Sequence, residues 1–208
     1  HMTITPNMIL QLHRLLYRYH PAEGGHFKRQ DNTIVETDPR GDVRVRFEPT
    51  GAMATPWATE QICQNFRVAR QDASREALVI APLFILDFLC IHPFADGNGR
   101  VSRLLTLLLL YQAGYEVGRY ISLERVIEQS KEGYDAALEA SSTGWHEDTH
   151  DPMPWLEYVW GMLTAAHAEF QERVDAILDA SISKAEQVEI VAPAYAHPFK
   201  LADLKARL

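Results

Sequence analysis

The sequence predicts an all-α protein with one small β-hairpin, and three observations support this. Residues 5–6 and 55–56 are both Thr-Pro, an N-cap residue followed by proline at the first helical position, and apolar residues recur at helical spacing after each pair. Between these helix starts, apolar and charged side chains alternate over residues 43–48, and residues 38–41 (Asp-Pro-Arg-Gly) have the composition of a tight turn. We therefore expect one hairpin within a helical protein.

The remaining elements follow from hydrophobic periodicity. The run 77–91 is apolar on nearly every side, so periodicity cannot separate a buried helix from a buried strand. Its length favours a helix, which Pro82 must either kink or restart. Further helices are expected near 98–111, 122–141 and 154–179. In the first helix the residues that recur at helical spacing are Ile9, Leu12, Leu16 and Tyr19.

Composition limits the class of protein. At 208 residues the chain is long enough for one well-filled core, and its net charge of −8 argues against a surface built for the nucleic-acid backbone. The apolar run 77–91 is shorter than the roughly 18–20 residues of a membrane span and contains Asp87. Cys63 and Cys90 lie in apolar surroundings and are expected to be buried free thiols. Since no basic-then-apolar signal opens the chain, we expect a soluble cytoplasmic protein without membrane contact.

Residues 97–99 (Gly-Asn-Gly) join two apolar helices and have the composition of an anion site. Glycines let successive backbone N–H groups point into one concavity, and the N-terminus of the following helix adds a positive end. Arg100 and Arg103 are three residues apart on its first turn, so both side chains can face the same anion, and arginine binds phosphate oxygens with two donors. We therefore expect a phosphate to bind here.

Three further residues complete this segment. Asp96 lies at the rim of the loop, where a carboxylate beside phosphates is best explained by Mg²⁺ held between them. His92 ends the preceding helix and is the one side chain of the cluster that titrates near neutral pH, so it is a candidate general base for a hydroxyl attacking phosphorus. Phe94 is expected to point inward and fix the loop to the core.

Simpler explanations exist for each residue taken alone. A histidine at a helix end is usually a cap, Gly-Asn-Gly alone is a turn, and two arginines on a helix can be a solvated face. A dinucleotide-binding unit is disfavoured because Ser102 replaces the third glycine and βαβ alternation is absent. A Walker loop is excluded by the missing Gly-Lys-Ser/Thr. Phosphate chemistry is the interpretation that explains every member of the cluster together.

In this arrangement, residues 92–103 (HPFADGNGRVSR) resemble the signature of the Fic family, H-x-F-x-[D/E]-G-N-G-R-x-x-R, at every fixed position. The similarity covers about residues 5–180 and includes residues 25–28 (GHFK), Asn32 with Ile34, residues 120–127, Tyr134 with 136–138, and Trp155 with Leu156. The resemblance implies the Fic fold, an all-α bundle with one hairpin, the flap, beside the active-site loop. It places a catalytic domain at 1–180, with the flap at about 32–48, and a separate tail at 181–208.

The resemblance implies transfer of AMP from ATP to a Ser, Thr or Tyr hydroxyl of a target protein, with release of pyrophosphate. By position, it assigns the general base to His92, the Mg²⁺ ligand to Asp96, the anion cradle to Gly97, Asn98 and Gly99, and the distal phosphates to Arg100 and Arg103. The flap residues Asn32, Thr33, Ile34 and Val35 would align the target by strand addition. For Tyr134, two interpretations stay open: a residue on the adenine side, or a core tyrosine.

Alternative functions and partners also follow from the resemblance. Other Fic-type reactions transfer phosphate, phosphocholine or UMP, or remove AMP, and a non-catalytic ATP-sensing regulator is a further alternative. Lys28 stands where the family usually has arginine. The inhibitory pattern [S/T]-x-x-x-E-[G/N] of many members is absent here, so we expect such a helix either upstream of Thr3 or on a partner protein. The oligomeric state stays open, a homodimer included.

The C-terminal residues suggest a different partner. Residues 187–208 resemble the first part of a winged helix-turn-helix that follows some Fic domains. Nucleic-acid binding is expected only through such a part.

Residues 146–150 (HEDTH) match the zinc motif H-E-x-x-H. Zinc binding needs both histidines on one face of a regular helix together with a third ligand. This segment lies between Gly144 and 151–152 (Asp-Pro), in a run rich in turn-forming residues. We therefore predict a loop here and no zinc protease.

Overall fold

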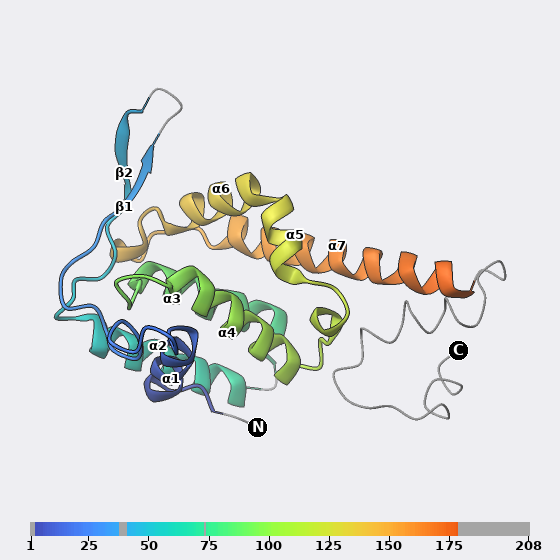
Figure 1. Cartoon of the computed structure of the whole chain (residues 1–208), viewed down its shortest axis with the longest axis horizontal. Helices are drawn as coiled ribbons and strands as arrows, with labels where there is room; N and C mark the ends of the chain where they lie inside the picture. Colours follow the sequence, from blue (N-terminus) through green and yellow to red (C-terminus); the bar gives the residue numbers. More distant parts are fainter. Residues whose placement is uncertain (1–2, 38–40, 73, 179–208) are drawn as a thin grey trace. The chain divides into compact units, whose positions relative to one another are not determined.

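The computed structural model describes residues 3–37, 41–72 and 74–178. Within them the chain is mostly helical, with one two-stranded antiparallel sheet (Figure 1), so the predicted fold class is confirmed. The elements are α1 Pro6–Leu16, β1 Ile34–Thr37, β2 Val43–Phe47, α2 Thr55–Gln71, α3 Ala77–Ile91, α4 Asn98–Gln112, the 3₁₀ turn Val117–Arg119, α5 Leu123–Gln129, α6 Lys131–Ser142, the 3₁₀ turn Trp145–Glu147 and α7 Met153–Leu178.

The chain forms two compact units. Among the described residues, one unit contains those up to Tyr115 and Ser130–Trp160; the other contains Glu116–Gln129 and residues 161–178. In the second unit, the Tyr120 and Phe170 rings pack together at 5.0 Å between centroids, and Arg125 pairs with Glu169. The predicted tail at 181–208, with its resemblance to a winged helix-turn-helix, lies outside the described residues. None of the described helices has the length and hydropathy needed to cross a membrane.

Both Thr-Pro pairs begin helices, in slightly different ways. Thr5 is the N-cap of α1, and its hydroxyl accepts a hydrogen bond from the Met8 N–H at 3.2 Å. In α2 the N-cap is Ala54, one residue before the predicted one, and Thr55 is already helical. The Thr55 hydroxyl instead donates to the Gly51 carbonyl at 3.0 Å.

Helix α3 contains Pro82 in its interior and nevertheless spans the whole apolar run. Proline has no N–H, so the carbonyl of Leu78, four residues earlier, loses its helical donor. The indole N–H of Trp160 donates to this carbonyl at 2.8 Å, and that of Trp155 donates to the Pro82 carbonyl at 2.9 Å. Two tryptophans of α7 therefore supply hydrogen bonds beside the proline.

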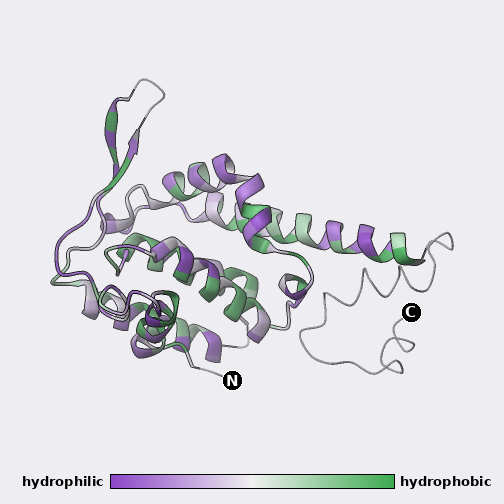
Figure 2. Cartoon of the chain, viewed as in Figure 1, coloured by the Kyte–Doolittle hydropathy of each residue, from purple (hydrophilic) through white to green (hydrophobic). Residues whose placement is uncertain are grey.

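Helices α3 and α4 form the centre of the first unit. Helix α3 packs against both α2 and α4, and Figure 2 shows long hydrophobic stretches in α3 and in the second half of α4. The core includes the fully buried Phe88, Val101 and Leu105. Cys63 and Cys90 are buried free thiols as predicted, and burial raises the pKa of Cys63 to about 12.

The hairpin occupies the predicted region. Strands β1 and β2 pair antiparallel from Ile34↔Phe47 to Thr37↔Val43, with an irregularity after Ile34. The predicted turn at 38–41 lies mostly outside the described residues. Two arginines of β2 pair with α6, Arg44 with Glu139 at 2.9 Å and Arg46 with Asp135 at 3.5 Å, so the hairpin is held against that helix.

The region expected as one helix near 122–141 forms two helices. Helix α5 ends at Gln129, and α6 begins after Ser130, whose φ of −116° is not helical. The Ser130 hydroxyl shares a 2.9 Å hydrogen bond with the Tyr158 hydroxyl. This contact comes from a residue distant in the sequence, so periodicity could not have predicted the break.

Candidate active site

The loop between α3 and α4 places His92 at the end of a buried helix. His92 is the C-cap of α3 and adopts a left-handed conformation, with φ 51° and ψ 62°. Its Nδ1 lies 3.3 Å from the Leu89 carbonyl oxygen. A carbonyl oxygen only accepts, so Nδ1 carries the proton and Nε2 keeps its lone pair. The residue therefore presents a basic nitrogen.

Burial is the main cause that lowers the pKa of His92 to about 4, and the nearby positive charges of Lys28 and Arg46 act in the same direction. The hydrogen bond to Leu89 and the charge of Asp96 act in the opposite direction. At neutral pH the imidazole is therefore uncharged and able to take a proton.

The backbone of the loop is fixed by Phe94 and Asn98. Phe94 is fully buried and stacks on the His13 ring at 3.8 Å between centroids. The Asn98 amide closes a ring with the backbone of Phe94: its Oδ1 accepts from the Phe94 N–H at 2.9 Å, and its Nδ2 donates to the Phe94 carbonyl at 2.8 Å. The Asn98 side chain is thus used to hold the loop. An anion could therefore be bound by the backbone N–H of Asn98 and not by its side chain.

Gly97 allows α1 to approach this loop closely. Its φ is 86°, and a Cβ there would lie 3.0 Å from Cε2 of Tyr17 and 3.3 Å from Nε2 of His13. The N–H groups of the first turn of α4 have no acceptor within their own helix, which suits them to an anion. Arg103 lies over this turn, with Nη1 at 3.5 Å from the Cβ position of Gly99.

Asp96 and Arg100 meet at the hydroxyl of Tyr17. The Tyr17 hydroxyl donates to Asp96 Oδ2 at 2.5 Å, and Arg100 Nη2 donates both to that hydroxyl and to Oδ2, each at 2.7 Å. Asp96 Oδ1 accepts from the Gly97 N–H at 2.6 Å. The hydrogen bond from Tyr17 is the main cause that lowers the pKa of Asp96, so this carboxylate is ionised.

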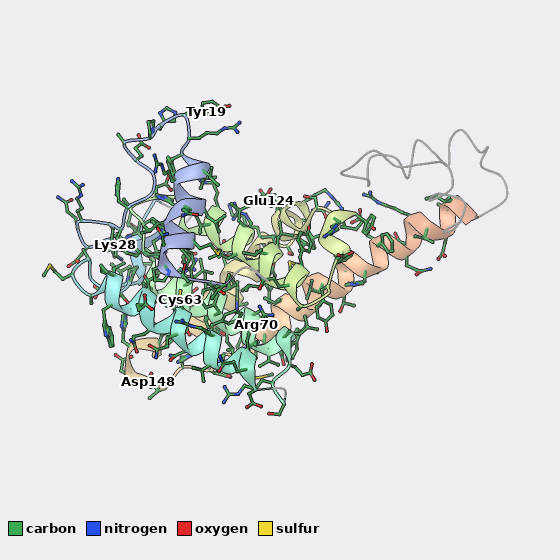
Figure 3. The ribbon with its side chains drawn as sticks, turned by 90° about the horizontal axis from the view of Figure 1, so that it is seen from below. Tyr19, Lys28, Cys63, Arg70, Glu124 and Asp148 are labelled. Carbon is green, nitrogen blue, oxygen red and sulfur yellow. The ribbon has the colours of Figure 1, made fainter. Side chains whose placement is uncertain are left out.

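His13 and Tyr17 were missed by sequence reasoning. His13 accepts the Gly25 N–H at Nδ1 and donates from Nε2 to the Asp96 carbonyl, both at 3.0 Å. Burial lowers the pKa of His13, which keeps the ring neutral. Of the predicted helical repeat, Ile9 is buried and Leu12 and Leu16 are half-buried, whereas Tyr19 is 77% exposed beyond the end of the helix (Figure 3). His13 and Tyr17 are buried as well. A sequence signal for these two residues did exist. Ile9, His13 and Tyr17 are spaced four residues apart, which places them on one face of a helix.

Lys28 and Asn32 connect the flap to the loop. Lys28 Nζ donates to Asn32 Oδ1 at 2.7 Å and to the Ile91 carbonyl at 3.1 Å, and Asn32 Nδ2 donates to the Phe94 carbonyl at 3.3 Å. Burial lowers the pKa of Lys28 to about 8. Asn32 therefore precedes β1 and points back to the loop, while Thr33 and Val35 are exposed and Ile34 is half-buried.

Tyr134 of α6 lies beside the first turns of α4. Its ring packs edge-on against Trp155 at 5.3 Å and against Tyr158 at 5.6 Å. Its hydroxyl bonds the side chain of Ser102, and burial raises its pKa to about 12. These contacts are those of a packed residue, and the adenine-side role stays a prediction.

The H-E-x-x-H match lies in a 3₁₀ turn and the loop after it, as the sequence predicted. His146 Nε2 donates to the Glu48 carbonyl at 2.7 Å, and its ring stacks on Phe47. Over the described residues, no three His, Cys, Asp or Glu side chains are grouped as a metal ion would require.

Comparison with known proteins identifies the family to which this fold and this loop belong. The family model of the Fic/DOC family matches residues 3–110, more than half of the chain. The chain belongs to the Fic/DOC family. The matched residues include α1, the hairpin and the whole signature at 92–103. His13 and Tyr17 therefore also lie within the part of the chain that the family model matches.

Curated relatives are similar over this same part. "Protein adenylyltransferase Fic" of Drosophila ananassae is 36% identical over 115 residues, 55% of this chain and 21% of the relative. The protein of the same name from Drosophila mojavensis is 36% identical over 113 residues, 54% of this chain and 20% of the relative. The chain therefore spans about a fifth of the length of the curated relatives it matches.

Solved structures share the Fic fold. A Fic family protein from Desulfovibrio desulfuricans superposes with a TM-score of 0.62 at 23% identity, covering 90% of this chain and 57% of that one. A Fic domain containing signalling protein from Bacteroides thetaiotaomicron gives a TM-score of 0.61 at 22% identity, covering 78% and 60%. These similarities show the fold.

Proposed function

We propose that this chain transfers AMP from ATP to a hydroxyl group of a target protein. The observation that carries the proposal is a neutral, basic His92 Nε2 on the same short loop as the N-terminus of α4 and two arginines. The name "Protein adenylyltransferase" of relatives that are 36% identical over about half the chain supports it.

In the proposed reaction, the phosphates of ATP lie against the loop at 97–99, with the N–H groups of Asn98 and Gly99 as donors because the Gly97 N–H donates to Asp96 Oδ1. Arg100 and Arg103 bind the distal phosphates. His92 Nε2 takes the proton of the target hydroxyl, and the hydroxyl oxygen forms a bond to the α-phosphorus. The bond from that phosphorus to the oxygen bridging to the β-phosphate breaks, and pyrophosphate leaves. The products are the AMP-modified protein and pyrophosphate.

Asp96 fits a Mg²⁺ ion shared with the substrate. Its side chain is 78% exposed and ionised, and among the described residues it belongs to no group of three His, Cys, Asp or Glu side chains that could hold a metal ion. Mg²⁺ commonly binds through one or two carboxylates together with substrate phosphates and water. When bound, the ion would neutralise part of the charge on the phosphates.

The flap supports docking of the target segment. Strand β1 pairs with β2 along one edge only, so its other edge can accept a further strand. Thr33 and Val35 are exposed beside the loop anchor Asn32 and could contact such a strand.

The test is incubation with ATP labelled at either the α- or the γ-phosphate, with Mg²⁺ and a protein lysate. Retained α-label supports AMP transfer, and retained γ-label shows phosphate transfer instead. No retained label, together with ATP binding, supports a sensing role, and release of AMP from a modified protein by hydrolysis shows removal of AMP instead.

Substitution of the base sharpens this test. His92→Ala should lower transfer by about 10²–10⁴-fold and leave ATP binding unchanged, because it removes only proton abstraction. His20→Ala changes an exposed histidine and serves as the control. Equal transfer by His92→Ala and the native chain would contradict the assignment of the base.

A further inference from the structure

The hydroxyl of Tyr17 occupies a position between two groups of the proposed site. It donates to Asp96 Oδ2 at 2.5 Å and accepts from Arg100 Nη2 at 2.7 Å. A phenol has one proton, so the directions of both bonds follow from the chemistry: arginine can only donate, and the ionised carboxylate can only accept. The hydroxyl therefore links the carboxylate and the arginine in one defined arrangement.

The ring of Tyr17 is itself held in place. It is 8% exposed, its Cε2 lies 3.0 Å from the Cβ position of Gly97, and the Arg100 guanidinium lies 5.1 Å from its centroid. One turn earlier on α1, His13 donates to the Asp96 carbonyl at 3.0 Å. Helix α1 thus contacts both the backbone and the side chain of Asp96.

The contacts leave one side of the Asp96 carboxylate open. Oδ2 receives Tyr17 and Arg100, and Oδ1 receives the Gly97 N–H, yet the side chain is 78% exposed. Each carboxylate oxygen has two lone pairs, so acceptor capacity for a cation remains. Groups that orient a metal-binding carboxylate typically change metal affinity or activity by about 10–100-fold when removed.

We propose that Tyr17 is a positioning residue that orients Asp96 toward the Mg²⁺ of the nucleotide and limits Arg100 to one oxygen, Oδ2, of that carboxylate. The inference rests on the proposed function. Without the hydroxyl, Arg100 loses one acceptor and can pair with both oxygens of Asp96, so the arginine competes with Mg²⁺ for the same carboxylate. Tyr17 acts through Asp96 and Arg100.

The test uses Tyr17→Phe, which removes the hydroxyl and keeps the ring contacts with Gly97 and Arg100. Tyr19→Phe is the matched control, because this tyrosine lies two residues away and is 77% exposed. Binding of fluorescent α,β-methylene-ATP, whose α–β linkage cannot be cleaved in the transfer, is followed while Mg²⁺ is increased. Thermal unfolding is recorded for each variant.

We expect Tyr17→Phe to raise the Mg²⁺ concentration for half-maximal binding by about tenfold, with Tyr19→Phe unchanged. A purely structural role would weaken nucleotide binding without moving this Mg²⁺ midpoint, and that result would overturn the inference while leaving the proposed function intact. Absence of nucleotide binding by the native chain at every Mg²⁺ concentration would overturn the proposed function and this inference with it.

Discussion

At the scale of single residues, the surroundings of His92 determine its chemistry. Its left-handed backbone, with φ 51°, is uncommon outside glycine and turns the imidazole back toward the carbonyl of Leu89. Burial and two nearby cations then lower its pKa to about 4. Sequence reasoning identified the residue from its neighbours, but the tautomer and the pKa follow from contacts with Leu89, Lys28 and Arg46 that periodicity does not reveal.

The low pKa of His92 predicts a pH-dependent stability. In the unfolded chain His92 takes up a proton as the pH falls through its ordinary value of 6.5, whereas in the folded chain it stays neutral until about pH 4. Protonation therefore favours the unfolded state in this window, and the free energy of unfolding should fall by about 2 kcal/mol between pH 7 and pH 5 because of this residue.

Urea unfolding of the native chain and of His92→Gln at both pH values measures this effect. The fall should be about 2 kcal/mol smaller in His92→Gln, whereas His20→Gln should behave as the native chain does. Equal falls in the native chain and His92→Gln would show that His92 takes up its proton in the folded chain at the ordinary pH.

At the scale of elements, helix α3 illustrates how tertiary contacts permit an unfavourable residue. The sequence indicated that Pro82 would kink or restart the helix; the helix does not restart there, since α3 runs from Ala77 to Ile91. The indole N–H of Trp160 satisfies the Leu78 carbonyl that the proline leaves without a donor. That partner lies 82 residues along the chain, which is why no local pattern predicted it.

Trp160→Phe should therefore destabilise the protein by about 1–2 kcal/mol, because it leaves the Leu78 carbonyl without this donor. Trp57→Phe is the matched control, since Trp57 is 69% exposed on α2 and should change stability by less than about 0.5 kcal/mol. Both are measured as the free energy of unfolding in urea. Similar effects of the two substitutions would mean that the hydrogen bond contributes nothing.

At the scale of the whole molecule, the candidate site is assembled from three separate stretches of the chain. Helix α1 supplies His13 and Tyr17, the segment before the flap supplies Lys28 and Asn32, and the third stretch is the loop at 92–103. Tyr17 and Asp96 are 79 residues apart in the sequence. Because these contacts exist only in the folded chain, a ligand bound here should stabilise the fold.

Mg²⁺ with α,β-methylene-ATP at about 100 times its dissociation constant should raise the unfolding temperature by roughly 5–10 °C. The Arg103→Ala variant should show a much smaller rise at the same ligand concentration, because it would lose the proposed contact to the distal phosphates. Differential scanning fluorimetry measures the unfolding temperature of the native chain and of Arg103→Ala, with and without the ligand. An equal rise in the variant would count against this role of Arg103.

The sequence by itself determined the all-α class, the hairpin, most helix boundaries and the family, because helix starts, turn residues and the spacing within 92–103 are local features. Only the tertiary structure decided which face of α1 is buried, where 122–141 breaks, the protonation of His92 and the partners of Asp96. The physical reason is that burial and hydrogen bonds between distant residues set these properties. His13 and Tyr17 belong to the site because the left-handed turn at Gly97 lets α1 approach the loop that closely.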